Sequence, residues 1–122
     1  MILDSNILIY AAEPGYEAVR RFIAECQPYL SAISKIEVLG YHRLTSDHRR
    51  KLEKLFEVAV VLPISEEVIE MAIALRQQKK MSLGDSIVAA TALVQGMILA
   101  TANIQGFEWI ESLRLVNPIA ET

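Results

Sequence analysis

An almost wholly apolar helix that carries a carboxylate in its first turn constrains this chain more than any other stretch. The pattern predicts a helix that begins near Ser82 and ends at Gly96. Its apolar residues include Ile87, Val88, Ala89, Ala90, Ala92 and Leu93. Because almost no polar face remains, we expect this helix to be buried nearly all round. Asp85 lies on the same side as Val88 and Ala92, and burial of an ionised carboxylate without partners is costly. Backbone N–H groups, a basic side chain or a metal ion would have to compensate its charge.

A structural role for Asp85 is the simpler alternative. Aspartate is favoured in the first turn of a helix, where it meets the positive end of the helix dipole, and Ser82 or Asp85 could merely cap the helix. A functional role gains weight only if other carboxylates occupy similar settings. Asp4 and Glu37 do so, because each lies among apolar residues and next to a predicted strand end or helix start.

Asp4 interrupts the apolar run with which the chain opens. Ile2 and Leu3 are typical of a buried parallel strand, whereas Asp4, Ser5 and Asn6 are poor strand formers and good local hydrogen bonders. We therefore expect a short strand that ends near Asp4 and then turns into a short helix. In parallel sheets, ligands bind at the carboxyl ends of the strands.

Glu37 follows a second predicted strand over residues 29–33. Ser34 resembles an N-cap, and Glu37 stands three residues later, which is the pattern of a capping box. A capping role and a metal-facing role for Glu37 are not exclusive, and both interpretations stay open at this point.

The rest of the chain alternates between helical and strand patterns. Helices are predicted over residues 16–26, from Ser46 or Asp47 to Phe56 and over 65–78, and strands over 58–64, 97–101 and 113–118. This alternation predicts an α/β fold, a three-layer α/β/α sandwich with a mostly parallel sheet of four to five strands. We expect a single domain over residues 1–122. The carboxyl ends of the strands share one edge, so Asp4, Glu37 and Asp85 could converge there.

Composition excludes several classes of protein. The net charge of −3, from 15 acidic and 12 basic residues, argues against a protein that coats nucleic acid by bulk charge, although a metal site could supply positive charge locally. The one cysteine, Cys26, excludes an internal disulfide framework. No apolar run reaches the ~18–20 residues that cross a bilayer, and no signal peptide is recognisable. We expect a cytoplasmic protein.

The carboxylates indicate a specific chemistry. Clustered carboxylates repel one another unless a proton or a cation bridges them, and oxygen ligands favour Mg²⁺ or Mn²⁺. Such ions promote phosphodiester hydrolysis. On this interpretation Asp4 and Asp85 hold the metal, and Glu37 binds metal or positions the attacking water. Ser5 and Asn6 would support them by hydrogen bonds.

The chain resembles the PIN domain family, in particular the small VapC-like toxin ribonucleases of bacterial toxin–antitoxin pairs. The motifs that carry this resemblance are Leu3-Asp4-Ser5-Asn6, Ser34-Lys35-Ile36-Glu37-Val38, Leu83-Gly84-Asp85 and Leu99-Ala100-Thr101-Ala102-Asn103 followed by Phe107. The resemblance implies an Mg²⁺- or Mn²⁺-dependent endoribonuclease that is frequently a homodimer and is neutralised by a small antitoxin. By position it makes Asp4, Glu37 and Asp85 the acidic active-site residues, and it places Ser5 and Asn103 among the polar supports.

One position departs from the family pattern. The family often has a fourth acid just before the phenylalanine, where this chain has Gly106. An amide can ligate Mg²⁺ or its waters but brings no charge, so we expect a weak or absent second metal position. The alternative is a PIN-like module that binds RNA or a protein partner without cleaving. Phosphoryl transfer with Asp4 as nucleophile is disfavoured, because a second aspartate would be wanted at Asn6 or a lysine after Thr101.

Overall fold

Five short parallel strands form the centre of the molecule in the computed structural model, which describes residues 1–119. The strands are β1 (Ile2–Leu3), β2 (Tyr29–Ser31), β3 (Val60–Leu62), β4 (Leu99–Ala100) and β5 (Leu115–Val116). They lie in the order β3-β2-β1-β4-β5, and each neighbouring pair is parallel. The order reverses next to the central strand β1. In sheets of this kind, the crevice at the point of reversal is where ligands bind.

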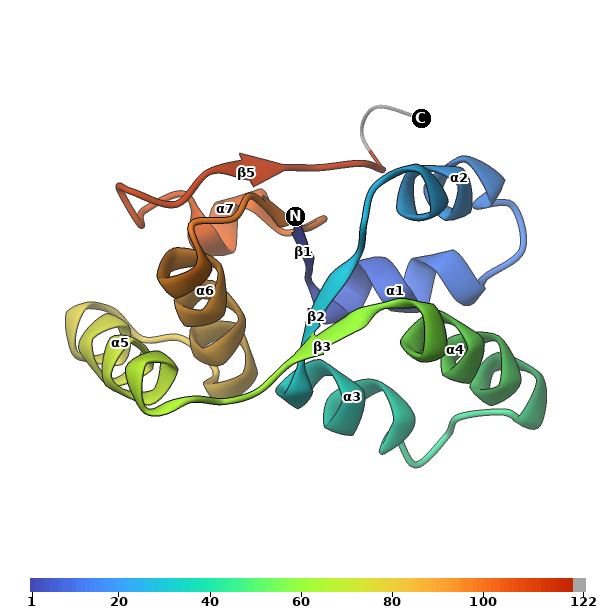
Figure 1. The fold of residues 1–122 in the computed structure, drawn as a ribbon, viewed down its shortest axis with the longest axis horizontal. Helices are drawn as coiled ribbons and strands as arrows, with labels where there is room; N and C mark the ends of the chain where they lie inside the picture. Colours follow the sequence, from blue (N-terminus) through green and yellow to red (C-terminus); the bar gives the residue numbers. More distant parts are fainter. Residues whose placement is uncertain (120–122) are drawn as a thin grey trace.

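Helices cover both faces of this sheet (Figure 1). On one side lie α1 (Ser5–Ala12), α2 (Glu17–Glu25), α3 (Ala32–Leu39) and α4 (Ser46–Val58), and on the other lie α5 (Glu66–Gln78), α6 (Leu83–Gln95) and the short α7 (Ile104–Phe107). Each face has its own hydrophobic cluster, because successive strand residues such as Ile2 and Leu3 point to opposite sides. The predicted three-layer α/β/α architecture is confirmed.

Helix α6 is the most deeply buried of the described helices. Residues 86–92 are all buried, as the apolar pattern predicts. Its one buried threonine, Thr91, donates its hydroxyl to the carbonyl of Ile87 at 2.6 Å, so no polar atom is stranded in the core. The helix ends at Gly96, whose φ of 64° is left-handed, as expected for a glycine at this position.

The predicted start of α3 was wrong. The helix is capped by Ser31, whose hydroxyl accepts a hydrogen bond from the backbone N–H of Ile33, and it begins three residues earlier than expected. Ser34 therefore lies inside the helix and is fully buried, so it forms no capping box with Glu37. The strand β2 is shorter than its apolar pattern suggests, because Ser31 already satisfies the first turn of the helix.

Other helix ends also differ from the prediction. Thr45 caps α4, in place of Ser46 or Asp47, by accepting from the backbone N–H of His48 at 3.2 Å. The segment 102–107 contains the single helical turn α7, and residues 108–110 form a turn and a bend after it. The edge strand predicted over residues 113–118 is present as β5.

Residues 120–122, which the predicted domain includes, lie outside the described residues. Over residues 1–119, none of the helices combines the length and apolar character that a membrane crossing requires.

Candidate active site

Asp4 lies where the strand order reverses, directly after β1. It is 5% exposed, and it is the N-cap of α1. One carboxylate oxygen, Oδ1, accepts a hydrogen bond from the backbone N–H of Ser5 at 2.8 Å. The other, Oδ2, accepts from the hydroxyl of Thr101 at 2.7 Å. Because Thr101 follows the neighbouring strand β4, this contact fixes the Asp4 side chain across the crevice.

Burial raises the pKa of Asp4 from its ordinary 3.8 to about 6. The hydrogen bond from Thr101 acts in the opposite direction, because it favours the charged form. The negative charges of Asp85 and Glu37 contribute to the raised pKa in the same direction as burial. The three acidic residues, although distant in sequence, therefore act on one another at this edge of the sheet. Either a proton or a cation relieves their repulsion.

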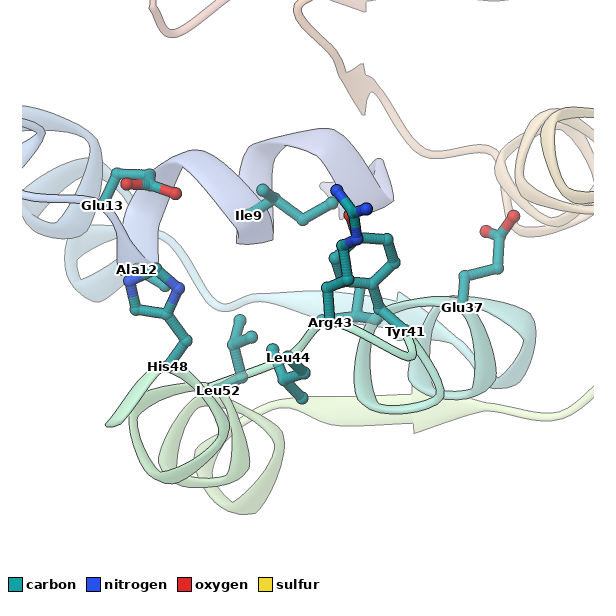
Figure 2. A pocket seen from close by; sticks show the side chains of 10 residues that line it. Ile9, Ala12, Glu13, Glu37, Tyr41, Arg43, Leu44, His48 and Leu52 are labelled. Atoms are coloured by element: carbon teal, nitrogen blue, oxygen red, sulfur yellow. The ribbon is translucent and has the colours of Figure 1, made fainter. Parts of the chain in front are cut away.

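Glu37 projects from α3 toward the same edge. It is exposed, which corrects the prediction of an apolar setting: its helical neighbours Lys35 and Ile36 face solvent as well. Its Oε1 atom accepts a hydrogen bond from the hydroxyl of Ser5 at 2.9 Å. Figure 2 shows the carboxylate turned toward α6, where it lies so close to Gly84 that a Cβ atom at that position would overlap it.

Asp85 lies in the first turn of α6 and is partly buried. The helix is capped by Ser82, whose hydroxyl accepts from the backbone N–H of Asp85 at 3.1 Å. Within residues 1–119, no hydrogen bond or ion pair engages the Asp85 carboxylate itself. Capping is thus accounted for by Ser82, and the carboxylate is available for another ligand.

Two asparagines fix the loop after β4: Asn6 links it to the start of α1, and Asn103 forms hydrogen bonds within the loop. Asn6 accepts a long hydrogen bond, 3.4 Å, from the backbone N–H of Ala102. The backbone N–H of Asn103 donates to the Thr101 hydroxyl at 3.0 Å, and its side-chain Oδ1 accepts from the backbone N–H of Gly106 at 3.2 Å. A Cβ atom at Gly106 would overlap the Asn103 amide nitrogen. The Asn103 side chain thus fills the space where a side chain at position 106 would begin.

Three residues of this site were missed as site residues by sequence reasoning: Thr101, Ser34 and Gly84. Thr101 had a usable signal, because it is a polar residue at the end of a buried strand, just as Asp4 is. Ser34 was interpreted as a cap, and its contact with Ser5 depends on the true start of α3. Gly84 had only its unfavourable helix propensity as a signal.

The donor set suits a hard divalent cation. In residues 1–119, no three Asp, Glu, His or Cys side chains approach closely enough to form a ready-made cation cage. Mg²⁺ is usually held by one or two carboxylates, and water and substrate phosphates complete its shell. Asp4, which has no basic ion-pair partner within residues 1–119, and Asp85, whose carboxylate is available, fit that pattern. The residues present therefore fit the expected metal.

A cavity of about 370 Å³ adjoins the site on the side of α4. Ile9, Leu44 and Leu52 contribute an apolar lining in the space between α1 and α4 (Figure 2). Arg43 and His48 add basic groups, and Glu37 lies at the end nearest the acidic site. The cavity is mostly apolar and opens to solvent.

These features define a class of protein: a parallel α/β sandwich with an acidic site at the reversal point of its strand order. The chain belongs to the PIN domain family, whose sequence pattern matches residues 1–110.

Relatives of known name resemble the chain over nearly its whole length. Ribonuclease VapC10 of Mycobacterium tuberculosis is 30% identical over an alignment that covers 93% of this chain and 90% of VapC10. Ribonuclease VapC1 of Rickettsia felis is 28% identical, covering 95% and 94%. A toxin–antitoxin complex from Klebsiella pneumoniae contains a chain that is 28% identical, with a TM-score of 0.75 and 96% coverage of both chains. The fold also matches VapBC2 of Rickettsia felis, with a TM-score of 0.82 at 20% identity over 95% of this chain and 96% of that one.

Proposed function

We propose that this protein is a metal-dependent endoribonuclease that hydrolyses phosphodiester bonds in RNA and is the toxin of a toxin–antitoxin pair. The observation that carries the proposal is the buried carboxylate of Asp4, whose pKa is raised to about 6 at the edge where Asp85 and Glu37 also lie. A cation beside this carboxylate would offset both its burial and the repulsion from the two neighbouring acids. The ribonuclease names of its relatives support the same activity.

The proposed roles follow from the contacts. Asp4 and Asp85 hold Mg²⁺ or Mn²⁺, which when bound polarises the phosphate and lowers the pKa of a coordinated water. Thr101 and the backbone of Ser5 fix the orientation of Asp4. Glu37, oriented by the Ser5 hydroxyl, ligates the metal or accepts a proton from the attacking water. Asn6 and Asn103 keep the loop after β4 in place.

The contact between Asn103 and Gly106 favours a second candidate, a PIN-like module that binds without cleaving. A neutral amide fills the place of the usual fourth acid, which reduces the negative charge available to a second ion. For the nuclease we therefore expect one bound ion. Calorimetric titration with Mn²⁺ separates the candidates. A nuclease should give a binding isotherm for the ion, whereas the absence of binding heat at millimolar Mn²⁺ favours the binding module.

The substitution Asp85→Asn tests the nuclease directly. We expect it to lower Mn²⁺-stimulated cleavage of a structured RNA by about a hundredfold or more, because the uncharged amide is a poor ligand for a hard cation. The melting temperature should not fall, since Ser82 caps the helix. Asp47→Asn is the matched control, because Asp47 is exposed on α4 and, among residues 1–119, forms an ion pair with Lys51 alone. Full cleavage by the Asp85 variant would contradict the proposal.

We further propose an antitoxin partner and a homodimer. The cavity beside Glu37 suits a peptide segment with apolar side chains, and the exposed Val60, Ile69 and Ile73 on β3 and α5 suit contact with a second copy. Light scattering should give the mass of two chains for the protein by itself and a larger mass after the product of a neighbouring antitoxin gene is added.

Ile9→Glu, at a half-exposed position of the cavity, should weaken the complex with the antitoxin at least about tenfold and leave the homodimer intact. A monomeric mass would contradict the proposed homodimer. An unchanged affinity of the Ile9→Glu variant for the antitoxin would contradict the proposed binding site.

A further inference from the structure

A chain of hydroxyl groups connects the interior of α3 with the Glu37 carboxylate. Ser34 is fully buried and lies one helical turn before Glu37, so the two side chains share one face of α3. The hydroxyl oxygen of Ser5, at the start of α1, lies 3.0 Å from the hydroxyl oxygen of Ser34 and 2.9 Å from Oε1 of Glu37. Ser5 thus bridges the two residues.

The direction of these hydrogen bonds follows from the number of protons. A serine hydroxyl carries one proton, so Ser5 can donate to only one of its two neighbours. The carboxylate is the stronger acceptor, and a hydrogen bond to a charged group is worth about twice a neutral one. The Ser5 proton therefore goes to Glu37, and the Ser34 hydroxyl must donate to Ser5. Donation by Ser34 polarises Ser5 and strengthens its bond to Glu37.

We propose that Ser34 is a positioning residue that orients Glu37 through Ser5. The proposal rests on the nuclease function argued above, in which Glu37 acts on the metal or on the attacking water. Ser34 cannot reach the substrate, because it is fully buried. Its hydroxyl has a different task from a mid-helix serine that bonds back to the preceding turn. It prevents the Ser5 hydroxyl from rotating away from Glu37.

The test is a double-mutant cycle of Ser34→Ala and Ser5→Ala. We expect Ser34→Ala to lower kcat with Mn²⁺ about tenfold and to leave KM for RNA unchanged, because it weakens one charge-assisted hydrogen bond. The double variant should be no slower than Ser5→Ala alone, since Ser34 acts only through Ser5. Ser86→Ala is the control: this serine is also fully buried, but its hydroxyl donates to the Leu83 carbonyl.

A second measurement needs no activity. In the metal-free protein, the carboxyl carbon signal of Glu37 in NMR should move in the same direction in Ser34→Ala and in Ser5→Ala, and should not move in Ser86→Ala. An unmoved signal with unchanged kcat overturns the proposal, and so do effects that multiply in the double variant. If the wild-type chain neither cleaves RNA nor binds Mn²⁺, the proposed function fails, while the NMR signal still decides whether Ser34 orients Glu37.

Discussion

Replacement of Asp4 by Asn is expected to make the metal-free protein more stable while abolishing RNA cleavage. Burial raises the pKa of this carboxyl from 3.8 to about 6, so at pH 8 the folded protein holds a charge that the unfolded chain accommodates more easily. The difference corresponds to about 3 kcal/mol. The Asn side chain has one oxygen in place of two, so it cannot accept the hydrogen bonds from both Ser5 and Thr101. The loss of one hydrogen bond costs about 1 kcal/mol. The expected net gain is therefore about 2 kcal/mol.

The pH dependence gives this prediction a distinctive signature. Because the folded pKa is the higher one, the folded state binds more protons between pH 3.8 and about 6. The stability contributed by protonated Asp4 is complete below pH 3.8 and is lost as the pH rises through about 6. Urea unfolding in EDTA at several pH values measures it. The quantity to compare is the unfolding free energy of the wild type minus that of Asp4→Asn, because titrating groups that do not interact with Asp4 cancel in that difference.

The contrary result is equally clear. If the two proteins keep a constant difference in unfolding free energy from pH 3 to pH 8, Asp4 is not held in an unfavourable environment for its charge. Added Mn²⁺ provides a further control. It should stabilise the wild type, because a ligand that binds only the folded state adds to its stability, and it should do so far less for Asp4→Asn.

The features that could be predicted well from the sequence alone are those that depend on a local pattern of apolar and polar residues. The buried helix with Asp85, the glycine that ends it and the break after Leu3 all follow from periodicity and turn chemistry, and the structure has them. The α/β class follows from the alternation of strands and helices. These features depend on residues that are neighbours in sequence, which is why pattern suffices for them.

The contacts between distant segments could not be predicted in this way. The start of α3 depended on which of two serines caps it, Ser31 or Ser34, and the local pattern favoured the wrong one. This shift of three residues moves Ser34 from a helix end into the interior, where it meets Ser5. The contact of Thr101 with Asp4 spans 97 positions and depends on β4 lying beside β1. Strand order is a property of the whole fold.

Gly84→Ala should lower activity without lowering stability. Gly84 is the second residue of α6, and a Cβ atom there would overlap the Glu37 carboxylate. The overlap involves the end of a flexible, exposed side chain, so Glu37 can move aside at little cost in folding free energy. Alanine is also the better helix former, by up to about 1 kcal/mol. We therefore expect unfolding at an equal or higher urea concentration.

Cleavage should respond in the opposite direction. A displaced Glu37 loses its place against α6, and a misplacement of about 1 Å in a catalytic group can cost about a hundredfold in rate. The matched control is Leu83→Ala, one residue earlier in the same helix turn, where the side chain is 57% exposed. Single-turnover cleavage with Mn²⁺ and urea unfolding of both variants measure the two effects. A Gly84→Ala protein that cleaves at the wild-type rate would mean that the position of the Glu37 carboxylate against α6 is not needed for the reaction.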